Sequence, residues 1–308
     1  MITKIKYVND VDPSSNSVLT IDKNMCSGWS NKSEGSFLAN SKTLDKSINN
    51  SNPLTENGTI TESPVATGAE LMAYSGFSAT NYLRLPANVL DVNSKSFNIM
   101  LWYKSSSETD NMLIHTGDAG VVGGVRAIHI VGDLLSFSAW STVVNSAKIV
   151  ADNLWHFISV SVVYISGTDY MIRMYADGEL VYNDTLSMVT FTNTAWDIGG
   201  TDITAGNAPY NTIGSLSLVR LSLNVPSSEQ IKEIYESEKH LFTDNTKCTL
   251  SSANSSVVNA LAYDDDTNLL HAAGSSNLDT FDGLVRIDSE VGSYTSLSAN
   301  TEMVVKGS

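Results

Sequence analysis

Cysteine, cationic side chains and long apolar runs are scarce in this 308-residue sequence. The two cysteines, Cys26 and Cys248, lie far apart in the chain, whereas a disulfide framework needs several closely spaced pairs. We therefore expect two free thiols. Lys and Arg number only 18 against 33 Asp and Glu, which gives a formal net charge of −15. A nucleic-acid partner is not expected, because contacts to phosphate require cations.

Segments that would carry the chain into or across a membrane are also missing from the sequence. No apolar run approaches the roughly 20 residues that a membrane span requires. The first residues, MITKIKYVNDVDPSSN, lack the apolar core of a secretion signal. We therefore expect a chain that is made in the cytoplasm, without a signal peptide and without membrane insertion.

What the sequence does contain is strand-like alternation near its middle. In Ile158–Tyr164 apolar residues recur at every second position, which is the period of a half-buried strand. Met171–Ala176 alternates in the same way after a Ser-Gly-Thr-Asp turn, so the two runs predict an antiparallel hairpin. Asp177 and Gly178 then offer the positive φ that a tight turn requires, before a returning strand at Glu179–Tyr182.

Two short motifs in this unit resemble a known family. They are Trp-His-Phe-Ile, starting at Trp155, and Tyr-Ala-Asp-Gly-Glu-Leu-Val, starting at Tyr175. In this order and at this separation they are similar to the signature of the laminin G-like, concanavalin A-like jelly rolls. Two further runs, SFNIMLWYK at Ser96–Lys104 and GSLSLVRLSL at Gly214–Leu223, are similar to other strands of that family.

The resemblance implies an all-β fold, with a concanavalin A-like (laminin G-like) β-sandwich jelly roll over residues 66–242. Within it, Ser96–Lys104 should be a central strand covered on both sides, because both of its faces are apolar. A capping box formed by Ser227 and Gln230 predicts a short amphipathic helix after the last strand of the sandwich.

The two ends of the chain differ from the jelly roll in composition. Residues 1–65 are rich in Ser, Asn, Thr and Lys, and we interpret them as an extended N-terminal assembly arm, with a floppy linker as the alternative. Residues 243–308 predict four short strands, a small antiparallel β module similar to one propeller blade. One blade cannot bury both of its faces. Its partners would come from other chains, from the arm or from sequence beyond Ser308, and a homo-oligomer such as a trimer supplies them most economically.

Catalytic signatures are missing from the sequence. Endoglucanases and agarases that share the fold carry a Glu-x-Asp-x-x-Glu strand, whose two glutamates flank the glycosidic bond. The nearest match begins at Glu108, and Leu113 replaces its last glutamate. The five histidines are scattered, and neither a G-x-S-x-G elbow nor a zinc motif occurs. We therefore predict that the protein is not an enzyme.

Calcium is the one cofactor that the resemblance implies, because laminin G-like domains often hold a calcium ion at the rim through oxygen ligands. The loop aspartates Asp118 and Asp202 are the candidate ligands. The acidic run Asp264–Asn268 looks like a further ligand set, but it lacks the Gly and the distal Glu of an EF-hand loop. A solvated hairpin turn explains this run.

Sugar recognition would need exposed aromatic rings beside polar groups. Trp140, Trp196 and Tyr210 lie at or near predicted strand ends and loops, so we name them as candidate ligand-binding residues. The alternative for each ring is packing under a loop.

Together these features predict a non-enzymatic virion protein, namely a bacteriophage tail fibre, receptor-binding or surface decoration protein. Its expected partners are copies of itself, other virion proteins and, through the jelly roll, host-surface glycan. An extracellular type of fold without a secretion signal motivates the virion localisation. The alternatives are a carbohydrate-binding module of a secreted polysaccharide-degrading protein and a degraded glycoside hydrolase.

Overall fold

The computed structural model describes residues 34–47, 52–87, 89–90, 92–109, 111–117, 125–139, 142–190, 195–200, 211–247, 258–300 and 303–307. These residues divide into two compact units. One unit, the sandwich, takes residues 34–65 and 71–242. The other, the C-terminal unit, takes residues 66–70 and the described residues from 243 onward. Each unit is described separately below.

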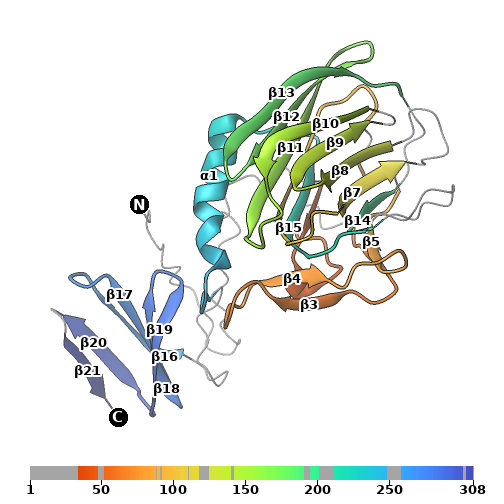
Figure 1. Ribbon diagram of the computed structural model, residues 1–308. Helices are drawn as coiled ribbons and strands as arrows, with labels where there is room; N and C mark the ends of the chain where they lie inside the picture. The colour runs from red at the N-terminus through yellow and green to blue at the C-terminus, as the bar shows by residue number, and fades with distance from the viewer. Residues whose placement is uncertain are drawn as a thin grey trace. The chain divides into compact units, whose positions relative to one another are not determined.

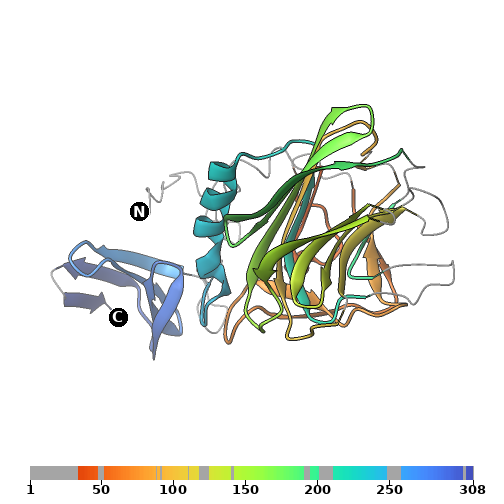
Figure 2. The same cartoon turned by 45° about the horizontal axis from the view of Figure 1, so that its top comes forward.

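The sandwich has two antiparallel sheets that face each other across one apolar core (Figure 2). The first, sheet A, has eight strands in the order β13-β12-β11-β6-β15-β4-β3, and β1 pairs with β15 beside this path (Figure 1). Its strands are β1 (Gly35–Phe37), β3 (Thr61–Pro64), β4 (Met72–Ser75), β6 (Phe97–Lys104), β11 (His156–Ser166), β12 (Asp169–Ala176), β13 (Glu179–Ser187) and β15 (Ser215–Ser222).

The second, sheet B, has seven strands in the order β10-β9-β8-β7-β14-β5-β2. The predicted all-β sandwich is therefore confirmed. The strands of sheet B are β2 (Thr55–Asn57), β5 (Tyr82–Arg84), β7 (Asn111–Gly117), β8 (Val125–Val131), β9 (Leu134–Ala139), β10 (Thr142–Ile149) and β14 (Trp196–Ile198).

Strand β6 is central, as its sequence predicts. It pairs with β11 on one side and with β15 on the other. Ile99 and Leu101 point into the core between the sheets. Trp102, on the opposite face, is 2% exposed because it stacks on Phe242 with a ring centroid distance of 4.1 Å. Both faces of the strand are therefore covered by apolar groups.

The predicted double hairpin is also confirmed, as β11, β12 and β13. Its second turn is made by Asp177 (φ 55°) and Gly178 (φ 78°), the left-handed pair that a two-residue hairpin turn requires. A Cβ at position 178 would lie 3.2 Å from the Tyr235 ring and 3.3 Å from Lys232 Cα. Glycine at this turn therefore also allows the helix of the sandwich to pack closely on it.

That helix, α1 (Ser228–Glu238), begins at the predicted capping box of Ser227 and Gln230, and the 3-10 turn η3 (Lys239–Phe242) follows it. Its last residue, Glu238, is 1% exposed. Arg220 on β15 donates to the Glu238 carboxylate through Nη1 and Nη2 at 2.6 and 2.9 Å, and Trp102 Nε1 donates at 2.8 Å. One buried carboxylate therefore joins the helix to two strands of sheet A.

The sandwich includes strands from residues that the sequence assigned to the N-terminal arm. β1, β2 and β3, and the short 3-10 turn η2 (Ala39–Ser41), all precede residue 66, and Phe37 is fully buried in the core. The boundary at residue 66 is therefore wrong for this part of the chain. These strands have three or four residues each and are polar in β2 and β3, too short for alternation to reveal them.

The C-terminal unit has a four-stranded antiparallel sheet in the order β16-β17-β18-β19 and a hairpin of β20 and β21. The structure describes six strands where the sequence predicts four, and β18 is hard to predict because a register shift between Thr280 and Phe281 breaks its period of two. None of the helices that the structure describes is long and apolar enough to span a membrane. The strands are β16 (Val258–Asp264), β17 (Leu269–Gly274), β18 (Asn277–Asp282), β19 (Val285–Val291), β20 (Ser296–Asn300) and β21 (Met303–Gly307).

We expect Glu238→Ala to lower the free energy of unfolding of the sandwich by about 3–5 kcal/mol, because it leaves the buried Arg220 guanidinium without its partner. Urea unfolding followed by tryptophan fluorescence measures this, since all five tryptophans precede residue 243. Glu236→Ala, which removes an exposed ion pair with Lys239, is the matched control and should cost less than about 1 kcal/mol. Equal losses in the two variants would contradict the anchoring role of Glu238.

Candidate functional site

One side of the sandwich is formed by an end strand from each sheet. β10 ends sheet B, β13 ends sheet A, and the two strands contact each other. We call β10, β13 and the segment 150–155 that joins β10 to β11 the edge surface. Large apolar side chains on it, 47 to 62% exposed, are Val143, Ile149, Leu154 and Leu180. The edge surface is therefore an accessible part of the molecule with apolar character.

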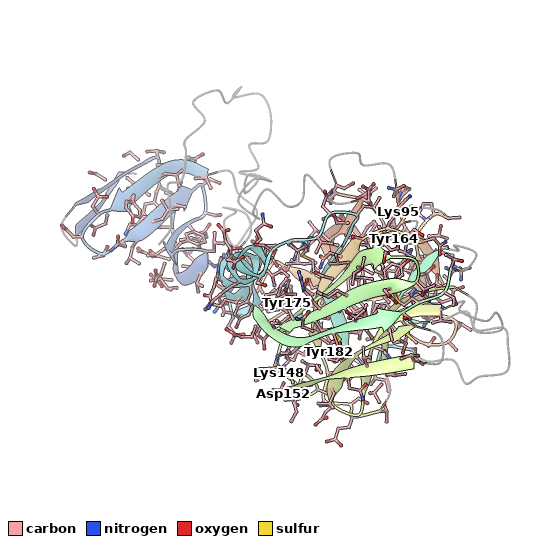
Figure 3. All side chains as sticks on the ribbon, turned by 90° about the horizontal axis from the view of Figure 1, so that it is seen from above. Lys95, Lys148, Asp152, Tyr164, Tyr175 and Tyr182 are labelled. Carbon is pink, nitrogen blue, oxygen red and sulfur yellow. The ribbon has the colours of Figure 1, made fainter. Side chains whose placement is uncertain are left out.

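An aromatic ring lies on this surface beside charged groups. Tyr182 on β13 is half-buried and packs against the rim of the core. Burial, and then the nearby carboxylate of Asp184, raise the pKa of the Tyr182 hydroxyl. Figure 3 shows Tyr182, Lys148 and Asp152 on this side of the sandwich. An amphipathic ring near a carboxylate, on a surface that also carries a cation, offers the groups that bind polar ligands with an apolar face.

Two carboxylates hold the imidazole of His156 at the start of β11. Its Nδ1 lies 2.8 Å from Asp177 Oδ2, and its Nε2 lies 2.9 Å from Asp152 Oδ1. Asp177 also accepts from the backbone N–H of Phe157 at 3.1 Å, and Lys148 Nζ lies 3.6 Å from Asp177 Oδ2. The cluster therefore connects β10, β11 and the turn between β12 and β13.

The charges in this cluster shift the pKa values of His156 and Asp152. Burial alone disfavours the charged ring, but hydrogen bonds to Asp177 and Asp152 outweigh it and raise the pKa of His156 above its ordinary value. Burial likewise opposes the charge of Asp152, and the hydrogen bonds from His156 and Leu154 lower the pKa of this carboxyl. Each group therefore favours the charged form of the other.

This arrangement suits binding rather than glycoside hydrolysis. Hydrolases place the scissile bond of the sugar between two carboxyl groups. Here the imidazole ring of His156 occupies the space between Asp152 and Asp177. The two carboxylates therefore hold a protein side chain, and Asp152, which is 39% exposed, offers its outer edge to solvent.

Polar side chains also form a row across the outward face of sheet B, where they alternate with core residues. At one end, Arg84 donates to both carboxylate oxygens of Asp197 at 2.7 and 2.8 Å. Further along, His129 Nε2 and Ser138 Oγ lie 2.6 Å apart. On the last strand, Asn145 Oδ1 accepts from Ser136 Oγ at 2.9 Å. The row therefore reaches the edge surface at β10.

The structure corrects one of the five predicted site residues. Trp196 is 1% exposed, its Nε1 donates to the carbonyl of Leu90 at 3.2 Å, and its ring makes an edge contact with Phe97. No face of this indole is open to a sugar, so its assignment as a stacking residue is wrong. The other four lie outside the described residues and stay predictions: Trp140, Tyr210, Asp118 and Asp202.

The calcium prediction rests on two aspartates that lie outside the described residues. Among them, no three His, Cys, Asp or Glu side chains come together as metal ligands. In the acidic run of β16 and its turn, the Asp264 carboxylate accepts from Asp266 N and Thr267 Oγ1 at 3.1 and 2.9 Å. This run is a closed hairpin turn, and its aspartates do not fit the calcium that the fold family implies.

Sequence reasoning missed Tyr182 and counted His156 among five scattered histidines. The signal for Tyr182 was its place in ELVYNDT, where a ring stands among polar residues of a strand. The partners of His156 lie 4 and 21 residues away. Only the pairing of β11 with β12 brings Asp177 to this ring.

The sequence itself identifies the family of this fold. A profile of the concanavalin A-like lectin/glucanases superfamily matches residues 77–232, from just before β5 to the middle of α1. The chain belongs to this superfamily. No curated protein matches the chain.

Solved structures show the same fold at low identity. The receptor-binding domain of botulinum neurotoxin C/D mosaic serotype is 13% identical with a TM-score of 0.51, over 86% of this chain and 63% of that domain. The binding domain of botulinum neurotoxin DC in complex with rat synaptotagmin II is 13% identical with a TM-score of 0.50, over 82% and 62%. This chain spans less than two thirds of either toxin domain.

A third solved structure aligns along nearly its whole length. It is domain 4 of AbnA, a GH43 extracellular arabinanase from Geobacillus stearothermophilus, in complex with arabinotriose. It is 16% identical with a TM-score of 0.48, over 66% of this chain and 98% of that domain. At these identities the likeness concerns the fold alone.

We expect Arg84→Met to lower the free energy of unfolding of the sandwich by about 2–3 kcal/mol, because Asp197, whose side chain is 3% exposed, loses both of its charged hydrogen bonds. Urea unfolding measures the change. The control is Lys42→Met, which breaks a half-exposed pair with Glu56 and should cost less than about 1 kcal/mol. An unchanged midpoint for Arg84→Met would contradict the anchoring role of the pair.

Proposed function

We propose that this chain is an adhesion protein whose jelly roll binds glycan at the edge surface. The observation that carries the proposal is the half-buried ring of Tyr182, close to the Asp184 carboxylate, on an accessible edge of a lectin/glucanase-type sandwich that also carries Lys148 and Asp152. A pyranose has an apolar face and a rim of hydroxyl groups, so it matches a tyrosine face flanked by donors and acceptors.

The polar row of sheet B supports the same proposal. Neighbouring strands lie about 4.8 Å apart, so the accessible members of the row, His129 on β8 and Asn145 on β10, lie two strands apart, whereas Ser136 and Ser138 on β9 between them are buried. An extended chain of sugars that lies across the strands would meet both accessible groups in succession. We therefore propose an oligosaccharide, rather than a single sugar, as the ligand.

We further propose that the protein acts on the surface of a bacteriophage-type virion, as a tail fibre, receptor-binding or decoration protein, in homo-oligomeric form. The receptor-binding domain of a botulinum neurotoxin has the same fold, so this type of sandwich is compatible with attachment to a cell surface. The proposal includes binding without turnover of the glycan, because Asp152 on the edge surface and Asp177 on the turn before β13 both hold His156.

We expect Tyr182→Ala to weaken binding on a glycan array by about tenfold or more, which corresponds to about 1.4 kcal/mol, because the ring loses its stacking contact. Tyr164→Ala is the matched control. Tyr164 is also half-buried against the core, but it lies towards the far end of β11 from His156. Circular dichroism checks that both variants fold. Full binding by Tyr182→Ala, or equal loss in both variants, would contradict the edge surface as the binding site.

The virion localisation has its own test. Mass spectrometry of purified particles should detect peptides of this chain in stoichiometric amounts, and native mass spectrometry should give a multiple of the 33.2 kDa chain. Particles without the chain would contradict the virion proposal while leaving the glycan site open to the array experiment.

A further inference from the structure

The contacts of His156 require more protons than a neutral histidine has. A neutral imidazole carries one N–H and one bare nitrogen, whereas an ionised carboxylate can only accept. His156 faces a carboxylate oxygen at each ring nitrogen, at 2.8 and 2.9 Å, and its side chain is 8% exposed. Both contacts are favourable at the same time only while the ring carries two protons.

The two carboxylates are not equally fixed. Asp177 is 18% exposed and keeps two partners besides the ring, namely the N–H of Phe157 and the ammonium group of Lys148. Asp152 is 39% exposed, and its other partner is the N–H of Leu154 in the same segment. A ring with one proton therefore keeps Asp177 and turns a lone pair towards Asp152.

We propose that His156 is a proton-operated latch on Asp152: the carboxylate is held against the ring while the imidazole carries two protons, and it is released when the imidazole is neutral. The N–H of Asn153, which donates to the carbonyl of Ser105 at 2.7 Å, and Trp155 Nε1, which donates to the carbonyl of Val65 at 2.8 Å, keep the rest of the segment in place. The latch stands on this geometry and does not depend on what the edge surface binds. Its release frees the carboxylate of Asp152 on the edge surface.

The charges around the latch come from four elements. Asp152 and Asp177 face the ring from the segment before β11 and from the turn after β12, and Lys148 reaches Asp177 from β10. Over the same turn, α1 presents Tyr235, whose hydroxyl pKa is raised by burial first and then by Asp177.

A further ion pair joins Glu179 at the start of β13 to Lys232 on α1, at 3.9 Å. Both side chains are well exposed, so water screens their effect on the ring. The two carboxylates in direct contact therefore dominate.

The sign of the pH dependence follows from the raised pKa of His156. The folded protein binds a proton at His156 more tightly than the unfolded chain does. Histidines of the unfolded chain titrate at about pH 6.5. The latch and its contribution to stability are therefore fully present below that pH. They are lost as the pH rises through the higher pKa of the folded protein.

Amide exchange of the full chain tests the latch. Hydrogen exchange is followed by mass spectrometry in a peptide covering residues 150–157 between pH 6 and pH 9, with labelling times scaled to the intrinsic exchange rate at each pH. We expect protection of the peptide to fall by about tenfold or more across this range, most of all at the Leu154 amide, which donates to Asp152, because the ring loses the proton that holds this carboxylate. Constant protection from pH 6 to pH 9 would overturn the latch.

Variants separate the latch from general loosening of the fold. His156→Gln and Asp152→Asn should both give low protection of this peptide that no longer changes with pH. His129→Gln, on sheet B, is the matched control and should keep the wild-type profile. Wild-type pH dependence in Asp152→Asn would overturn the assignment of the released carboxylate.

The side-chain nitrogens of the wild-type protein give a readout that needs no variant. Nitrogen-15 shifts of the His156 ring should show both nitrogens protonated at pH 6, and a single N–H, at Nδ1, once the ring is neutral. A neutral ring already at pH 6, or a neutral ring with its proton at Nε2, would overturn the latch.

Discussion

The position of helix α1 on sheet A depends on the contacts of the Glu238 carboxylate. Glu238 is 1% exposed and accepts from both terminal nitrogens of Arg220 and from the indole of Trp102. A buried charge of this kind contributes little net stability when fully paired but is costly to leave unpaired. Its effect is therefore to select one position of α1 over others. Because α1 packs on the turn at Gly178, that position also sets where β13 and the edge surface lie.

Much of this fold could be predicted from the sequence, and the part that could not has a physical cause. The run Ser96–Lys104 and the hairpin after Trp155 are long, alternate regularly and end in residues suited to turns, so local preference and tertiary position agree. β2 and β3 hold three or four mostly polar residues at the borders of the sheets. β18 contains a bulge that shifts its apolar side chains between faces. Such strands form because neighbouring strands pair with them, and their own sequences lack the alternation that would predict a strand.

The candidate site was less predictable than the fold. Trp196 follows a stretch that looks like a loop in the sequence. It in fact begins β14, a strand of three residues that pairs with both β5 and β7. This pairing places its ring in the core beside Phe97. Tyr182 resembles any other strand residue until β13 is known to be the last strand of its sheet. His156 needs a partner from a turn 21 residues away. Position within a sheet and contacts between distant residues decided these three cases, and neither is visible in local sequence.

The unpaired borders of β10 and β13 have a consequence for colloidal behaviour. A free strand border is a template on which another chain can add, and proteins protect such borders with charge. Here Lys148 lies on one border, and Glu179 and Asp184 lie on the other, within a chain whose formal net charge is −15. That mutual repulsion opposes the addition of another copy at these two borders at neutral pH. Near the isoelectric point of about 4.6 the repulsion vanishes while the backbone groups of both borders remain available, so acid precipitation would start along these two strands.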